Sequence, residues 1–248
     1  MRLKVLSYNI HRAIGVDRRF RPERIVDILA HHDADLVLLQ EVDDGVPRSR
    51  GMNLGRELAL ALGYPHLALG HNVQLRRGMY GNATMSRYPI VRESNIDLTI
   101  QTRKRRGCLH TSIQAEARTG YSYLVDVFNT HLGLSAQERV RQVGRLVRSS
   151  EFAALGHHRT CLVGGDFNDW RSLLEPIFTE ILEFKSATDR KYGSEKAIRT
   201  YPSFSPTGAL DRIYYRGGLR LTASRSCRMN ASRVASDHLP VIAEFELY

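Results

Sequence analysis

Carboxylate and amide side chains gather directly after a short apolar stretch in the second half of the chain. The segment Cys161-Leu-Val-Gly-Gly-Asp166-Phe-Asn168-Asp169-Trp170 brings two carboxylates and an amide together. Its two glycines would let backbone approach closely at the point where the first acid emerges. Core packing does not require this order of polar groups, so the segment indicates a ligand or a reaction.

Further polar side chains follow other apolar, strand-like stretches of the chain. They are Asn9, Glu41, His131, Asp211 and the pair Asp237-His238. A single Asp or Asn in such a place often only caps a turn, so the inference rests on the whole set. Carboxylates, amides and imidazoles without a thiolate suit Mg²⁺ or Mn²⁺, which usually complete their shell with water and substrate phosphate.

Two halves of the chain repeat one order of features, and this repeat would position the polar groups. The first half predicts strand, helix and strand over Leu3–Ile10, Pro22–Ala30 and Asp35–Leu39. The second half predicts the same order over Tyr121–Phe128, Ala136–Phe152 and the apolar stretch before Asp166. Each half also carries Asn-x-His after its first strand and an acid after its second. Two such βαβ-like halves would form two packed sheets whose strand ends meet along one edge.

The remaining pattern predicts one more helix and further strands. The helix is expected over Asn53–Leu62, and two strands around a turn over Gly78–Asp97, where Tyr88-Pro89 interrupts the run. A hairpin is predicted from Leu109–Ala117 and Tyr121–Phe128. The final strands are predicted over Leu210–Tyr215, Leu219–Ser224 and Val241–Leu247. No linker interrupts the sequence, so we expect one domain over residues 1–248, with Ser135 capping the longest helix.

The composition is that of an ordinary globular protein. Apolar residues make up 42% of the 248 residues and charged residues 25%, which is enough to bury a core. No basic-then-apolar leader opens the chain, and no apolar run approaches the roughly 20 residues of a membrane span. The three cysteines are far apart, which predicts buried thiols rather than disulfides. We expect a cytoplasmic protein that acts as a monomer.

The net charge of +10 is the unusual feature of the composition. Basic residues occupy loop-like places, which include Arg18-Arg19, Arg48, Arg50, Arg76-Arg77 and Arg103-Lys-Arg-Arg106. A solubilising surface would explain any one of these runs, but together they favour a phosphate-bearing partner. Nucleic acid is the expected partner, and an anionic phospholipid would suit the same charge.

Taken in order along the chain, these residues resemble the endonuclease/exonuclease/phosphatase superfamily, which includes DNase I. The resemblance rests on Asn9, Leu-Gln-Glu41, Asn-Thr-His131-Leu, Gly-Asp166-Phe-Asn168, Leu-Asp211-Arg-Ile and Ser-Asp237-His238-Leu-Pro. The stretch Gly81–Pro89 is also similar to one found in many bacterial members. Short uncharacterised bacterial proteins that share Gly-Asp-Phe-Asn-Asp-Trp-Arg are the most similar members.

The resemblance implies a four-layer α/β sandwich, in which two packed mixed β-sheets are flanked by helices, and Mg²⁺-dependent cleavage of a phosphoester. Glu41 resembles the principal metal carboxylate of the family, and Asn9 and Asp237 would lie near the ion. Mn²⁺ would also fit a site of this kind.

The resemblance also implies roles for the remaining site residues. Asp166 would orient or deprotonate the attacking water, and Asn168 would hold the phosphate or that water. His238, oriented by Asp211, would contact the scissile phosphate and stabilise its developing charge. His131 would be a second imidazole on the phosphate.

The residues that would read the substrate are less sharply defined. Asn82, Arg106 and Trp170 are the candidates for substrate contact. Asp169-Trp170 fits either an Asx-type helix start with a packed indole, which is slightly favoured, or a lip that faces the substrate. No stretch matches the DNA-intercalating loops of abasic-site endonucleases or the apolar hairpin of sphingomyelinases.

We therefore expect a Mg²⁺-dependent phosphodiesterase that acts on nucleic acid, as an endonuclease or exonuclease would. A phospholipid phosphodiesterase or a phosphomonoesterase with the same site is the alternative. A catalytically silent binding module is a remote alternative, because such a protein should have lost some of the expected groups.

Overall fold

The computed structural model describes residues 1–116, 120–156, 158–189 and 197–248, which form two six-stranded mixed sheets. The first sheet runs, in spatial order, through β11 (Leu219–Ser226), β12 (Val241–Leu247), β1 (Arg2–Asn9), β2 (Leu36–Asp44), β4 (Met79–Ser86) and β3 (His66–Gln74). The second sheet runs through β5 (Ile90–Asp97), β6 (Gly107–Glu116), β7 (Ser122–His131), β8 (Cys161–Asp166), β10 (Asp211–Arg216) and β9 (Lys185–Ser186).

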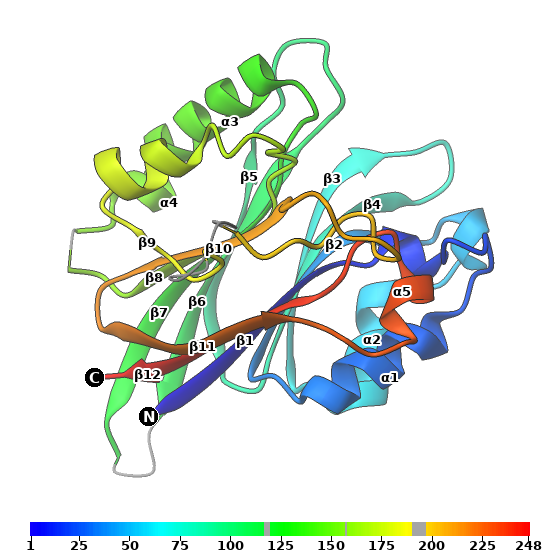
Figure 1. Cartoon of the computed structure of the whole chain (residues 1–248), viewed down its shortest axis with the longest axis horizontal. Helices are drawn as coiled ribbons and strands as arrows, with labels where there is room; N and C mark the ends of the chain where they lie inside the picture. The colour runs from blue at the N-terminus through cyan, green and yellow to red at the C-terminus, as the bar shows by residue number, and fades with distance from the viewer. Residues whose placement is uncertain (117–119, 157, 190–196) are drawn as a thin grey trace.

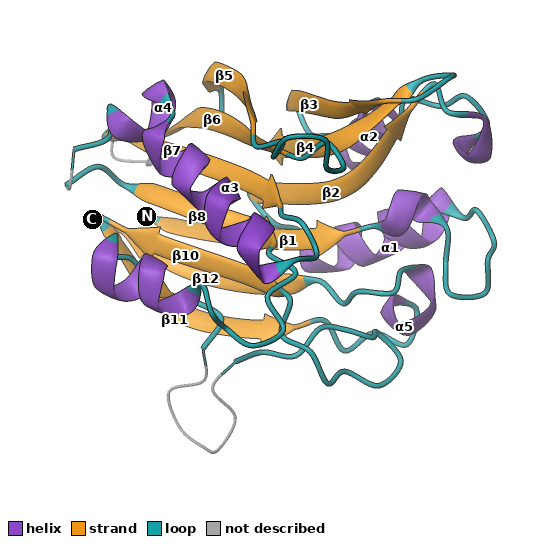
Figure 2. Cartoon of the chain, turned by 90° about the horizontal axis from the view of Figure 1, so that it is seen from above, coloured by secondary structure: helices purple, strands orange, loops and turns teal. Residues whose placement is uncertain are grey.

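Helices cover the outer face of each sheet. Beside the first sheet lie α1 (Pro22–His32), α2 (Leu54–Leu62) and α5 (Ser232–Ala235). Beside the second lie α3 (Ala136–Arg148) and α4 (Ser150–Ala153), and α3 runs across the strands in Figure 2. Short helical turns occur at His11–Ala13, Pro47–Ser49 and Ile177–Ile181. Figure 1 shows the two sheets between the two groups of helices, so the predicted four-layer α/β sandwich is confirmed.

The side chains of the strands alternate between two layers of core, as a pleated strand requires. In β1, Leu3 and Val5 pack between the two sheets, whereas Leu6 and Tyr8 pack in the cluster that contains α1 and α2. Because the alternation continues to the end of the strand, Asn9 faces the layer between the sheets.

The repeat predicted from the sequence is present in the fold. β1 and β2 pair in parallel in the first sheet, and β7 and β8 pair in parallel in the second. A helix connects each pair: α1 lies between β1 and β2, and α3 lies between β7 and β8. The carboxyl ends of these four strands are therefore brought to the same edge of the molecule.

The two strands predicted around Tyr88-Pro89 are present, as β4 and β5, but they belong to different sheets. The segment Gly78–Asp97 does not form two paired strands, because β4 pairs with β2 and β3 whereas β5 pairs with β6 in the other sheet. The chain crosses between the sheets at a tight bend, where the Ser86 hydroxyl accepts from the backbone N–H of Tyr88 at 3.0 Å. The pattern also fails to indicate β3, most of whose residues are only half-buried.

The long helix predicted over Ala136–Phe152 is divided in two. α3 ends at Arg148, and the backbone of Ser149 is extended. The Ser149 side chain caps the start of α4 by accepting from the backbone N–H of Phe152. Ser135 stands at the start of α3 but makes no side-chain capping hydrogen bond, so that predicted cap is wrong. The predicted hairpin forms from β6 and β7, while its residues 117–119 lie outside the described ranges.

The cysteines and the helices bear on two further predictions. Cys108, Cys161 and Cys227 are buried and free, which confirms the predicted thiols. Burial raises the pKa of Cys108 well above its ordinary value, so this thiol stays protonated. In the described part of the chain, no helix is long and apolar enough to cross a membrane.

Candidate active site

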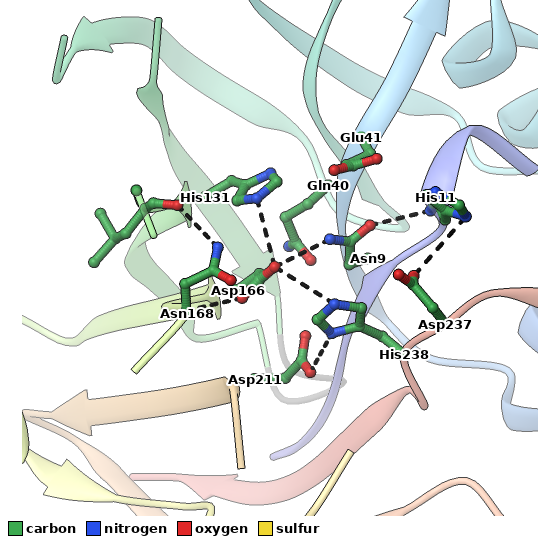
Figure 3. A network of polar contacts seen from close by, with 12 residues as sticks. Asn9, His11, Gln40, Glu41, His131, Asp166, Asn168, Asp211, Asp237 and His238 are labelled. Atoms are coloured by element: carbon green, nitrogen blue, oxygen red, sulfur yellow. Dashed lines mark hydrogen bonds and ion pairs between the residues drawn. The ribbon is translucent and has the colours of Figure 1, made fainter. Parts of the chain in front are cut away.

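Polar side chains replace the apolar core at one end of the layer between the sheets. In β8, Leu162 packs between the sheets and Val163 packs on the outer side, so Asp166 faces inward by the same alternation. The alternation of the neighbouring strands brings in Asn9, Gln40, His131 and Asp211. Figure 3 shows these residues converging, with Asp166 at the centre of their contacts.

Asp166 is held in one orientation at the end of β8. Its Oδ1 accepts from the backbone N–H of Asn168 at 2.9 Å, an Asx turn, and its Oδ2 accepts from the Asn9 amide at 3.0 Å. Gly165 makes this arrangement possible: its φ is 138°, and a Cβ there would lie 1.9 Å from the carbonyl oxygen of Thr130. Burial raises the pKa of Asp166 to about 6. This carboxyl group is therefore suited to exchange a proton near neutral pH.

His238 lies between two carboxylates. Its Nδ1 lies 2.8 Å from Asp211 Oδ2, and its Nε2 lies 3.7 Å from Asp166 Oδ2. The Thr200 hydroxyl donates to the same oxygen of Asp211 and fixes that carboxylate. Burial opposes a charge on the imidazole, but Asp211 and Asp166 outweigh it and raise the pKa of His238 to about 10. His238 is therefore an imidazolium at neutral pH.

His131 lies on another side of the same carboxylate. Its Nε2 is 3.5 Å from Asp166 Oδ2. Burial, together with the positive charges of Arg106 and His238, lowers the pKa of His131 well below its ordinary value. Asp166 thus lies between one charged and one neutral imidazole, which can serve different purposes in proton transfer and charge stabilisation.

Asn9 connects Asp166 with the segment that carries Asp237. The amide oxygen of Asn9 accepts from the backbone N–H of His11 at 3.0 Å. The Ser236 hydroxyl donates to the backbone carbonyl of Asn9 at 2.7 Å and so ties the neighbouring Asp237 to the end of β1. The carboxylate of Asp237 is one-third exposed and lies 3.9 Å from His11 Nδ1.

Glu41 lies at a β-bulge inside β2 and not at a strand end. The predicted strand stops at Leu39, whereas β2 continues to Asp44, with a register shift between Leu39 and Val42. Glu41 has a φ of 58°, and such a bulge re-aims a side chain. Its Oε2 is buried without a hydrogen-bond partner and lies 3.3 Å from Arg12 Nε.

Asn9, Glu41 and Asp237 offer oxygen atoms of the type that a hard divalent cation prefers. Asn9 pairs with Gln40 across β1 and β2, so Glu41 follows directly beside it. A buried carboxylate oxygen that lacks a hydrogen-bond donor is costly, and a cation would compensate for it.

A second group of possible metal ligands lies close by. Asp166, Asp211 and His238 bring their ligand atoms within 4.8 Å of one another. A charged imidazole that already binds Asp211 through Nδ1 repels a cation, so this group suits proton and phosphate chemistry better.

The three candidates for substrate contact lie in different settings. Asn82 is buried, and its amide donates to two backbone carbonyls across the sheet interface. Arg106 is 6% exposed and lines a small cavity with Asn82 and His131, and its Nε has no hydrogen-bond partner. Trp170 is 54% exposed. Their roles in binding stay predictions.

Two alternatives are predicted for Asp169-Trp170: a helix start with a packed indole, or a lip that faces the substrate. Asp169 fits the first alternative, and Trp170 does not. Asp169 Oδ2 accepts from the backbone N–H of Leu174 at 2.7 Å, so the acid does cap the turn that follows. The indole of Trp170 leaves more than half of its surface exposed and is not packed into a core.

Part of the framework of the site is not indicated by the sequence pattern. Gln40 Nε2 donates to Asn129 Oδ1 at 2.8 Å, which links the two sheets next to the polar groups around Asp166. Gln40 and Asn129 are each a polar residue within an apolar run, close to Glu41 and His131, and this is the sequence signal that could have pointed to them. Thr200 lies in a segment without periodicity, and no sequence signal points to its bond with Asp211.

A larger cavity lies at the opposite ends of the same strands. It has a volume of about 790 Å³ and is lined by Met1, Tyr215 and Tyr248 among others. Among the described residues, Glu246 is the one acidic side chain of its lining, and it pairs with Arg220 at the surface. The cavity therefore offers no grouping of acids and bases comparable to that around Asp166.

The chain is similar to known proteins over its whole length. A model of the Endonuclease/Exonuclease/phosphatase family matches residues 6–238. The uncharacterized protein YbhP of Escherichia coli K12 is 31% identical over 252 residues, which cover 98% of this chain and 96% of YbhP.

Solved structures share the fold at lower identity. An endonuclease/exonuclease/phosphatase from Beutenbergia cavernae DSM 12333 gives a TM-score of 0.78 at 20% identity, covering 99% of this chain and 72% of that one. ANGEL2, a 2′,3′-cyclic phosphatase in complex with adenosine-2′,3′-vanadate, gives 0.75 at 18% identity, covering 100% and 96%.

The family match contains every residue predicted for the site, from Asn9 to His238. Members of this family are hydrolases that act on phosphate esters and generally depend on a divalent metal ion. The fold, the ordered polar groups at its strand ends and the match over residues 6–238 lead to one conclusion: the chain belongs to the endonuclease/exonuclease/phosphatase family.

Proposed function

We propose that the protein is a Mg²⁺-dependent phosphodiesterase that hydrolyses phosphodiester bonds, above all in nucleic acid, by in-line attack of water. The observation that carries this proposal is the position of Asp166 between the charged His238 and the neutral His131. A phosphodiester is anionic and repels nucleophiles. Cationic and amide donors placed where charge develops therefore lower the barrier.

Each residue near Asp166 has a role that follows from its charge. Asp166, with a pKa of about 6, orients the attacking water and accepts its proton. His238 donates from its imidazolium to a phosphate oxygen, and Asp211 keeps that imidazole charged. The neutral His131 holds the phosphate or the leaving group, and Asn168 holds the phosphate or the water.

Glu41, Asn9 and Asp237 would hold the Mg²⁺ ion, and Mn²⁺ would fit the same oxygen ligands. When bound, the ion supplies positive charge that stabilises the charge developing on the phosphate. Arg12 lies beside the carboxylate of Glu41 and partly neutralises it.

Cationic side chains near His131 support an extended polyanionic substrate. Arg105 and Arg106 line the small cavity next to His131. Lys104 and Arg48 lie over the ring of Tyr80, at 5.5 and 5.6 Å from its centre. Arg48 is already paired with the Asp43 carboxylate, so Lys104, Arg105 and Arg106 supply the positive charge here. Such a group of cations favours a substrate with several phosphates over a compact monoester.

The test uses purified protein and four substrates: a plasmid, bis(p-nitrophenyl) phosphate, p-nitrophenyl phosphate and anionic phospholipid vesicles. We expect diester hydrolysis with Mg²⁺ and none with EDTA. Asp166→Asn and His238→Ala should each lower the rate at least about 100-fold, whereas the exposed control Asp33→Asn should not. Retained activity in both site variants would contradict the roles given above. Preference for the monoester or the phospholipid would identify the alternative substrate, and no turnover would leave a binding module.

A separate test addresses the metal. Glu41→Gln keeps the shape of the side chain but removes its charge, so the Mg²⁺ concentration for half-maximal rate should rise at least about 10-fold. The increase in Tm on adding Mg²⁺ should shrink in the same variant, which gives a readout independent of turnover. Asp44→Asn, on the same strand, is the matched control. Equal Mg²⁺ dependence in Glu41→Gln and wild type would remove Glu41 from the metal site.

A further inference from the structure

Two aromatic side chains, Tyr201 and Trp170, lie one behind the other next to His238. The ring centres of Tyr201 and His238 are 5.0 Å apart, and those of Trp170 and Tyr201 are 5.4 Å apart with the rings nearly perpendicular. Trp170 is the one tryptophan of the chain, and 54% of its surface is exposed. An exposed indole gives up the burial that usually stabilises such a ring, so its position needs an explanation.

The position of Trp170 is fixed by the residues around it. The preceding Asp169 is buried, accepts from the backbone N–H of Leu174 and lies 3.3 Å from Arg139 Nη2. Gly208 lies directly against the indole, and a Cβ there would meet the Cζ3 atom of the ring at 2.8 Å. The ring is therefore held in place while one part of it stays open to solvent.

Tyr201 is tied to the elements that carry the catalytic groups. Its backbone carbonyl accepts from the N–H of Gly208 at 2.7 Å. The preceding Thr200 donates through its hydroxyl to Asp211 and accepts through its carbonyl from the N–H of Leu239. Tyr201 is thus linked through Thr200 to Asp211, and through Gly208 to the indole of Trp170.

We propose that Trp170 and Tyr201 form the binding surface for a nucleobase, the one next to the phosphate that His238 contacts. This proposal rests on the proposed function and names the substrate group that the site takes. A nucleobase is planar and largely uncharged, and it stacks on an aromatic ring whatever its sequence identity. Contact with Tyr201 holds the indole with the two rings nearly perpendicular, and the base would stack on the exposed part of Trp170.

A membrane surface is the other occupant that an exposed aromatic ring would suit. Membrane contact requires a contiguous apolar patch. Trp170 is instead preceded by the buried Asp169 and followed by the exposed Arg171. Leu173 and Phe204 are also exposed, but an indole held against Tyr201 beside a phosphate-binding imidazolium fits one base better than it fits a lipid surface.

The first experiment is a pair of substrates with the same leaving group, thymidine 5′-(p-nitrophenyl phosphate) and methyl p-nitrophenyl phosphate. Trp170→Ala should lower kcat/KM about 10- to 100-fold for the thymidine substrate and less than about twofold for the methyl substrate. Trp170→Phe should restore most of the loss, and Tyr248→Ala, an exposed tyrosine at the opposite end of the strands, should change neither substrate. Equal losses on both substrates would overturn the proposal, because they would show a structural role for the indole.

The second experiment does not depend on turnover. Because Trp170 is the only tryptophan, the intrinsic fluorescence of the protein reports on this one ring. In EDTA, adenosine 5′-monophosphate should quench the emission saturably, whereas ribose 5-phosphate should not. Equal or absent quenching with both would overturn the proposal, as would a response only to anionic phospholipid vesicles. If wild type hydrolyses neither p-nitrophenyl substrate, the proposed function fails, and saturable quenching by adenosine 5′-monophosphate alone still supports base binding.

Discussion

Of the carboxylates around His238, Asp211 lies closest to the imidazole. Asp211 contacts Nδ1 at 2.8 Å, while Asp166 is more distant from Nε2, at 3.7 Å. Asp211 therefore contributes more to keeping the imidazole charged, and it leaves Asp166 free for the water. Such a division of labour between two acids allows one carboxylate to stabilise charge and the other to move a proton.

Replacing Asp211 with Asn should change both the rate and its pH dependence. We expect kcat/KM for a soluble aryl phosphodiester to fall about 100-fold at neutral pH. Asp211 and Asp166 raise the pKa of His238 to about 10, so the proton stays on the imidazole up to that pH. Without Asp211 the imidazole loses its proton at lower pH, so the alkaline limb of the kcat/KM profile should shift to lower pH.

The control for this prediction is Thr200→Val, which removes only the hydroxyl that donates to Asp211. It should move the alkaline limb in the same direction by a smaller amount. A profile measured from pH 6 to 10 that keeps its alkaline limb in Asp211→Asn would contradict the assignment.

At the scale of elements, the close pairing of β7 and β8 brings His131 and Asp166 together. The two residues are register partners across these parallel strands. The backbone of Gly165 makes this approach possible, because it has a φ of 138° and lies against Thr130. A side chain at this point would push the two strands apart where the site is built, so the small size of Gly165 serves function as well as folding.

Gly165→Ala should lower the free energy of unfolding by at least about 2 kcal/mol, because it adds backbone strain to a steric overlap. Gly51→Ala is the matched control: its φ of 71° is also left-handed, but nothing lies within 4 Å of the added Cβ. The control should cost about 1 kcal/mol, which is the strain alone. Urea denaturation measures both, and equal losses would show that the contact with Thr130 can relax.

At the scale of the whole molecule, the net charge of +10 should make activity on nucleic acid sensitive to salt. Raising NaCl from about 50 to about 200 mM should weaken apparent affinity for a plasmid at least about 10-fold. The rate on methyl p-nitrophenyl phosphate, which carries one charge, should change less than about twofold. A plasmid affinity that is insensitive to salt would argue against an extended polyanionic substrate.

The sequence predicts most of the layered fold, because strands and helices alternate with clear periods. The two βαβ halves and the acid at the end of β8 follow from local pattern alone. The bulge that aims Glu41 depends on register with β4, and a register shift leaves no sequence period to detect. The exposure of Trp170 likewise depends on Gly208 and Tyr201, which come from a distant part of the chain.

The hydrogen bond between Asn9 and Asp166 has a consequence for the order of folding. It joins residues 157 positions apart, one from each sheet, so neither sheet alone contains it. Contacts of such long range form only after the entropy of closing a long loop has been overcome. Recovery of activity during refolding should therefore require the two sheets to have packed together, and enzyme assays would report that step.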